Sequence, residues 1–125
     1  MGANNVYFTK DHEWLSVEGD EATVGITEHA QQALGDITFV DLPKVGKVVN
    51  AHDPLLVVES VKAASDVFAP VAGTVSAVNE KLTASPELIN QAAQTAGWLC
   101  KLKPFTPAVN ELMTAEQYEA FLQEN

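Results

Sequence analysis

Short runs in which apolar and polar residues alternate, separated by turn-forming residues, fill most of the chain. Alternation with a period of two places apolar side chains on one face of a β-strand, and closely spaced Gly, Pro, Asn and Asp connect such strands. Many short strands with few long helices predict an antiparallel β-sandwich or small barrel. The predicted strands are residues 6–8, 14–17, 22–26, 36–42, 74–78 and 98–103, together with two runs between 55 and 70.

The two runs between residues 55 and 70 form a predicted hairpin. They are rich in Val, Leu and Phe, follow the turn signal His52-Asp53-Pro54 and end before Pro70-Val71-Ala72-Gly73. Lys62 falls near the tip. An ammonium group on the solvated tip of a rigid hairpin can be enclosed by a modifying enzyme without unfolding its surroundings, so Lys62 is a candidate for acylation. Taken alone, an exposed lysine at a β-turn is more often only a solubilising charge.

Two internal segments carry helix signals. Thr27 can cap a helix that runs to Leu34 and stops at Gly35. Ser85 followed by Pro86 is a start signal for a second short helix, because Ser caps well and Pro fits the first helical position.

The C-terminal region predicts a further helix that docks on the sheet. Residues 114–117 form a capping box, and an apolar stripe follows it at helical spacing. The stripe consists of Tyr118, Phe121 and Leu122. We therefore expect a single domain over residues 1–125, with a core at about 6–103 and a C-terminal helical segment at 107–123.

Composition and charge exclude several classes of protein. With 46% hydrophobic and 19% charged residues, the chain is too apolar to be disordered, and no apolar run approaches the length needed to cross a bilayer. Its net charge of −10 disfavours nucleic acid and anionic membranes. The negative charge favours partners with basic docking faces. An equally simple explanation is that it keeps the protein soluble. Residues 1–6 lack a basic segment followed by an apolar one, so we expect a cytoplasmic protein.

The sequence disfavours an enzyme. It contains no glycine-rich phosphate loop, nucleophile elbow or metal-ligand spacing. The single cysteine, Cys100, shares a strand face with apolar neighbours, which predicts a buried packing residue in a reducing compartment. His12, His29 and His52 are scattered between polar neighbours and are predicted to be surface residues.

Residues 59–70, ESVKAASDVFAP, resemble the lipoyl-lysine segment of the glycine cleavage system H-protein family. The resemblance covers nearly the whole chain. It implies a mostly β barrel-sandwich hybrid, as in lipoyl and biotinyl domains, with two antiparallel sheets, short peripheral helices and a C-terminal helix. The other matching motifs are Asp11-His12-Glu13-Trp14, Val24-Gly25-Ile26-Thr27 leading into Ala30-Gln31, Leu34-Gly35-Asp36-Ile37, Ser85-Pro86-Glu87-Leu88-Ile89-Asn90 and Gly97-Trp98-Leu99.

The resemblance also implies that lipoate is the cofactor, joined to Lys62 by an amide. Glu59, Val61 and Ala63 would then form the context that lipoate-attaching enzymes recognise. Biotin carriers have methionine on both sides of the modified lysine. This chain has Val61 and Ala63 there, which argues against biotin.

The function implied by the resemblance is that of a non-catalytic carrier in glycine catabolism and one-carbon metabolism. Its swinging arm would take the aminomethyl group of glycine from a pyridoxal-phosphate glycine decarboxylase to a tetrahydrofolate-dependent aminomethyltransferase. Dihydrolipoamide dehydrogenase would reoxidise the arm. An H-like relay that donates lipoyl groups to other enzymes remains an alternative.

Two carboxylates match positions of an arm-binding cleft in this family. They are Glu13, beside Trp14, and Asp66, shortly after the arm site. Without the family, each would be interpreted as an exposed carboxylate at a strand end. Residues 91–96 depart from the family's pattern, because the usual Pro-Tyr before Gly97-Trp98 is absent.

Overall fold

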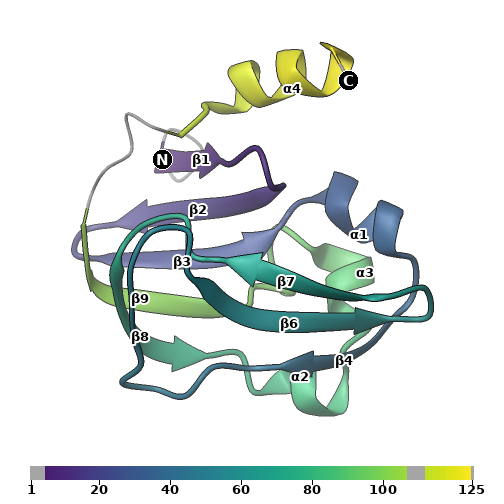
Figure 1. Cartoon of the computed structure of the whole chain (residues 1–125), viewed down its shortest axis with the longest axis horizontal. Coiled ribbons are helices and arrows are strands. Elements are labelled where there is room, and N and C mark those ends of the chain that lie inside the picture. The colour runs from purple at the N-terminus through teal and green to yellow at the C-terminus, as the bar shows by residue number, and fades with distance from the viewer. Residues whose placement is uncertain (1–4, 107–111, 125) are drawn as a thin grey trace.

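The computed structural model describes residues 5–106 and 112–124 and consists mainly of two antiparallel sheets (Figure 1). The sheets do not close into a barrel. The predicted fold class is confirmed. The strands are β1 Val6–Phe8, β2 Glu13–Glu18, β3 Glu21–Ile26, β4 Ile37–Asp41, β5 Val48–Val49, β6 Pro54–Ser60, β7 Ala64–Phe68, β8 Gly73–Val78 and β9 Cys100–Phe105.

Six strands form the larger sheet and three form the smaller one. The larger sheet has the order β1-β2-β3-β9-β8-β5, and the smaller one has the order β4-β6-β7. Each sheet is apolar on its inner face, because alternate side chains of a strand point to the same side. The smaller sheet contributes Leu56, Val58 and Val67 to the core, and the larger sheet contributes Leu15, Val24, Val75 and Leu102.

Short helices lie at the edges of the sheets. They are α1 Glu28–Leu34, α2 Lys81–Ala84, α3 Leu88–Ala92 and α4 Ala115–Glu124. The signals for α1 are confirmed: Thr27 accepts a hydrogen bond from the Ala30 N–H through its side chain, and Gly35 ends the helix with φ 80°. In Figure 1, α1 and the tip of the β6–β7 hairpin lie at the same end of the molecule.

The predicted start of the second helix is wrong. Ser85 ends α2, a helix that the sequence pattern did not reveal, and α3 begins only after Glu87. The Ser85 carbonyl accepts a hydrogen bond from the Leu88 N–H, so Ser85-Pro86 forms the turn between two short helices. The pair Ser-Pro, which favours the start of a helix, is equally compatible with a turn between two helices.

Two strand predictions also need correction, and β-bulges explain both. The last strand continues through Pro104 to Phe105, because Lys103 and Pro104 lie opposite the single residue Thr74 in a bulge. In β4, a register shift between Ile37 and Phe39 breaks the alternation. Phe39 is therefore 48% exposed, although the pattern places it on the apolar face.

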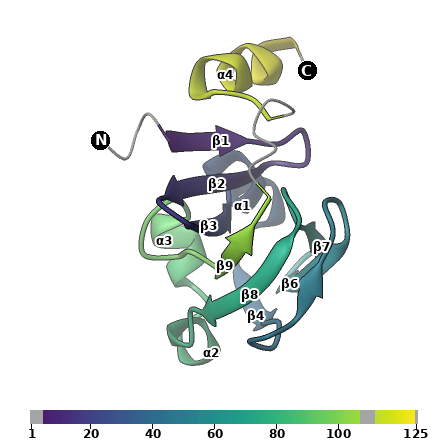
Figure 2. The same ribbon diagram turned by 90° about the vertical axis from the view of Figure 1, so that its left-hand side faces the viewer.

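The C-terminal helix packs on β1, as Figure 2 shows. The Tyr118 ring stacks on Phe8 with 4.8 Å between centroids. The capping box is present, since Thr114 and Gln117 each donate a backbone N–H to the other's side chain. The predicted stripe is confirmed, because Phe121 and Leu122 pack against the same cluster as Tyr118. Of the predicted helical segment, residues 107–111 lie outside the described residues.

Gly97 generates a stability prediction. A Cβ there would lie 2.8 Å from the Leu88 carbonyl oxygen and 2.9 Å from that of Ala92, both backbone atoms that cannot move cheaply. Gly97→Ala should therefore destabilise the protein by about 1 to 3 kcal/mol in urea unfolding. Gly19→Asn is the matched control, because Gly19 faces open space and Asn tolerates its positive φ. Equal stability of Gly97→Ala and wild type would contradict the prediction.

Candidate functional site

Lys62 lies at the tip of the β6–β7 hairpin, where the side chain of Ser60 fixes the turn. The Ser60 Oγ accepts hydrogen bonds from the backbone N–H groups of Lys62 and Ala63, each at 3.2 Å. It also lies 3.1 Å from the Ala63 carbonyl oxygen, to which it donates. Both strands end against this turn, with Glu59 opposite Ala64. The turn is thus locked locally while the Lys62 side chain is exposed.

The hairpin tip is also attached to the loop that follows α1. The Val61 N–H donates to the Asp36 carbonyl at 3.0 Å. A Cβ at Gly35 would lie 3.6 Å from Cε of Lys62, so the lysine stem lies over the end of α1. These two contacts hold the tip against the end of that helix.

Beside the tip, a cavity of about 180 Å³ lies between α1 and β7. Its walls are mostly apolar, and both Glu13 and Asp66 line it. The apolar part consists of Ile26, Ala30, Ala33, Leu34, Val58 and Val67. The structure thus brings together the two carboxylates that the sequence singled out, at the side of the molecule that carries the tip.

Glu13 is buried, with only 2% of its surface exposed, so the interpretation as an exposed strand-end carboxylate is wrong. Its Oε2 accepts from the Phe68 N–H at 2.8 Å, and its Oε1 accepts from the Thr9 hydroxyl at 3.0 Å. Burial raises the pKa of Glu13 to about 7, while these two hydrogen bonds oppose the shift. Glu13 therefore ties the larger sheet to the base of the hairpin and can change charge near neutral pH.

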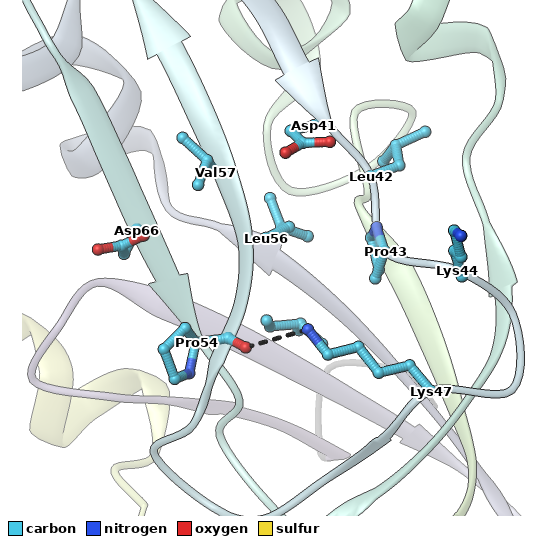
Figure 3. Close-up of a pocket in the computed structure, with 10 residues that line it drawn as sticks. Asp41, Leu42, Pro43, Lys44, Lys47, Pro54, Leu56, Val57 and Asp66 are labelled. Carbon is cyan, nitrogen blue, oxygen red and sulfur yellow. Dashed lines mark hydrogen bonds between the residues drawn. The ribbon is translucent and has the colours of Figure 1, made fainter.

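Asp66 is exposed and lies between two hollows. Besides the cavity under α1, it lines a groove of about 590 Å³ between β6 and the segment that follows β4 (Figure 3). Asp41, Lys44 and Lys47 line that groove as well, and the Lys47 Nζ lies 3.5 Å from the Pro54 carbonyl oxygen. The groove is at the end of β6 far from Lys62. The cavity under α1 is therefore the hollow associated with the tip.

The prediction that the histidines are scattered surface residues is wrong in two respects, because His12 is half-buried and lies beside His29. Its Nδ1 lies 2.7 Å from the Tyr118 hydroxyl, and its ring centroid is 4.4 Å from that of His29. Burial lowers the pKa of His12, as does His29, while Asp11 opposes the shift. His29 and His52 are exposed, as predicted. The contact between His12 and Tyr118 joins residues 106 positions apart, so local sequence could not reveal it.

Ser60 is the residue that sequence reasoning missed at the tip. A serine at the first position of a four-residue turn commonly accepts a hydrogen bond from a backbone N–H two or three residues later. Ser60 stands at that position before Lys62 and Ala63, so the sequence contains the signal. Recognising it would have added Ser60 to the context residues Glu59, Val61 and Ala63.

Other chemistries find no support in the part of the chain that the structure describes. No group of three or more His, Cys, Asp or Glu residues there could hold a metal ion. Cys100 is buried, as predicted, and desolvation raises its pKa to about 12, which makes it a poor nucleophile. None of the described helices is both long and apolar enough to span a membrane.

Comparison with known proteins agrees with the resemblance seen in the sequence. The family model for the glycine cleavage H-protein matches residues 6–125. The glycine cleavage system H protein of Caulobacter vibrioides is 54% identical over 116 residues, covering 92% of this chain and 96% of the relative. That of Cronobacter sakazakii is 53% identical over 123 residues, covering 97% and 95%.

A solved structure is similar as well. The crystal structure of a glycine cleavage system H protein from Mycobacterium marinum superposes with a TM-score of 0.87 at 39% identity, over 95% of this chain and 97% of that one. These similarities support the carrier role in glycine cleavage, and they do not favour the lipoyl relay. The chain belongs to the glycine cleavage H-protein family.

Proposed function

We propose that Lys62 carries a lipoyl group in amide linkage and that the protein acts as a non-catalytic carrier subunit in the cytoplasm. The observation that carries this proposal is a lysine on a turn locked by Ser60, beside a cavity that Glu13 and Asp66 line. Small exposed Ala63 leaves space around the amine for an attaching enzyme. A bound lipoyl group would supply a disulfide that can take up the aminomethyl group of glycine on one sulfur while the other sulfur becomes a thiol, and the dithiol would form only once that group has been passed on.

The chain's own residues would position and protect the arm. The apolar wall formed by Ala30, Ala33 and Leu34 excludes water from one side of the cavity. Asp66 offers a carboxylate that attracts the amine of the loaded carrier. Glu13 lies deeper, where an approaching cation would favour its ionised form and lower its pKa from about 7.

The partners we propose are the glycine decarboxylase, the aminomethyltransferase, dihydrolipoamide dehydrogenase and the lipoate-attaching enzymes. The net charge of −10 favours partners with basic surfaces. Near the tip, Val61 is 66% exposed and Glu59 is exposed, so a partner meets an apolar and an acidic group beside the lysine.

Lys62 should be the only lipoylated residue. Peptide mapping after growth with lipoate should find one lipoyl group, on Lys62, and Lys62→Arg should fold normally yet carry none. A guanidinium is not an acylation nucleophile at neutral pH. Lys47→Arg is the matched control and should be lipoylated like wild type. Modification of another lysine would refute the assignment.

The same variant tests the carrier role. Lipoylated wild type mixed with an active glycine decarboxylase should support exchange of bicarbonate with the glycine carboxyl group, and Lys62→Arg should support none. A protein that only relays lipoyl groups would show no exchange in either form.

The charge of Glu13 should make stability depend on pH. Its folded pKa of about 7 exceeds the ordinary glutamate value of 4.5, so the folded state binds the proton more tightly than the unfolded chain. The resulting stability, at most about 3 kcal/mol, is fully present below about pH 4.5 and is lost as the pH rises through about 7.

Urea unfolding across that range measures the effect. The difference in unfolding free energy between wild type and Glu13→Gln should shrink or reverse as the pH rises, because Gln cannot titrate. Glu18→Gln, at an exposed position, is the control. A difference between wild type and Glu13→Gln that stays constant with pH would contradict the assignment.

The carboxylates of Glu13 and Asp66 should protect the loaded arm, whereas the oxidised arm gains no charge-assisted contact from either of them. Only the loaded arm ends in a cationic amine, which gains a charge-assisted hydrogen bond worth about 1.5 to 3 kcal/mol. Asp66→Asn or Glu13→Gln should accelerate the uncatalysed release of formaldehyde about tenfold if the loss exceeds about 1.4 kcal/mol. Asp41→Asn, an exposed carboxylate on the same sheet, is the control. If both test variants retain their load as long as wild type, neither residue serves the cleft.

A further inference from the structure

The side chain of Asn90 connects α3 to the corner of the chain that supports the hairpin tip. Its Oδ1 accepts from the Ile37 N–H at 2.8 Å. Its Nδ2 donates to the Gly35 carbonyl and to Oε1 of Gln31, each at 2.9 Å. The amide thus uses its oxygen and both of its N–H donors.

The corner that Asn90 holds, residues 35–37, supports the tip on its other side. The Asp36 carbonyl accepts from the Val61 N–H at 3.0 Å, and Gly35 lies against the stem of Lys62. Within this corner, Gly35 and Ile37 bond to Asn90 of α3, while the Asp36 carbonyl and Gly35 contact the lysine tip.

This corner needs support from outside its own segment. Gly35 has φ 80° and ψ −154°, a conformation that only glycine adopts readily and that glycine leaves easily. The Asn90 side chain donates to the Gly35 carbonyl and accepts from the Ile37 N–H, so it fixes the directions of both groups. Loss of the amide would leave these groups to find other partners, which favours other conformations of the corner.

We propose that Asn90 is a positioning residue that fixes the direction in which the Lys62 side chain leaves the hairpin. Leu34, which lines the cavity under α1, directly precedes Gly35, so a stem lying over Gly35 starts at the mouth of that cavity. For a long flexible arm, the starting direction sets the effective concentration of its end in the cavity. This consequence for the arm rests on the proposed function, whereas the position of the corner does not.

Hydrogen exchange of the Val61 amide in the unmodified protein tests the inference without lipoate. Asn90→Ala should accelerate this exchange about tenfold relative to the amides of β2 and β3, because losing the support costs the corner about the net value of one hydrogen bond. A purely structural role would accelerate all of these amides together through global unfolding.

Asn79→Ala is the matched control. Asn79 is buried, whereas Asn90 is half-buried, and the Asn79 side chain likewise donates two hydrogen bonds, to the carbonyls of Ala96 and Trp98, neither of which lies in the corner. It should lower stability without selectively exposing Val61. If Asn90→Ala folds poorly, Asn90→Asp is the second variant. It keeps the size of the side chain but turns a carboxylate oxygen toward the Gly35 carbonyl and Oε1 of Gln31, which are both acceptors. It should give the same selective acceleration of exchange at Val61.

The loaded carrier gives the second measurement. Asn90→Ala should release formaldehyde severalfold faster than Asn79→Ala while remaining fully lipoylated. Unchanged relative exchange at Val61 in both Asn90 variants, or an equal change in Asn79→Ala, would overturn the inference. Selective exchange in a protein whose lipoyl group maps elsewhere would instead overturn the proposed function and leave the role of Asn90 in holding the corner intact.

Discussion

The hydrogen bond from the Phe68 N–H to the buried carboxylate of Glu13 is the interaction on which the geometry of the site depends. Among the residues that the structure describes, the two sheets share no strand ladder, so packing and a few polar contacts set the position of the β6–β7 hairpin. This contact joins the first residue of β2 to the last residue of β7, at 2.8 Å. Hydrophobic packing is not directional, whereas a short bond to a buried carboxylate is. It therefore fixes the base of the hairpin as Ser60 fixes the tip.

Burial of Glu13 has a cost that its hydrogen bonds only partly offset. The carboxyl is most stable in the folded protein when protonated, yet the same group lines the cavity where a cation would favour its ionised form. Stability of the empty cleft and affinity for a cationic amine therefore depend on opposite charge states of one residue. A site of this kind is expected to sacrifice some stability near neutral pH for function.

The parts of the fold that depend on local sequence were predictable. Period-two alternation gave the strands, and Thr27 and Gly35 gave both ends of α1. Bulges were not predictable, because one extra residue shifts which side chains face inward without any change in composition. That is why Phe39 is exposed and why Pro104 lies within a strand. The position of Lys62 at a hairpin tip needed only turn signals and two β-prone runs.

The site itself needed contacts between residues far apart in the sequence. The burial of Glu13 depends on Phe68, 55 residues later, and the environment of His12 depends on Tyr118. Motif resemblance did associate Glu13 with Asp66, but it could not show that one is buried and the other exposed. The state of a carboxylate is a property of its surroundings, and the fold alone supplies those.

The lysine tip combines a rigid base with a free end, and its supports come from different ranges of the chain. Ser60 locks the turn within four residues, whereas the corner at 35–37 holds the turn against α1. A local lock alone would leave the hairpin free to twist relative to the cavity, and a long-range contact alone would leave the turn without a fixed shape. Together they leave the side chain of Lys62 as the flexible part of the tip. If Lys62 is modified as we propose, an attaching enzyme or a partner therefore meets one defined surface and orders only one side chain on binding.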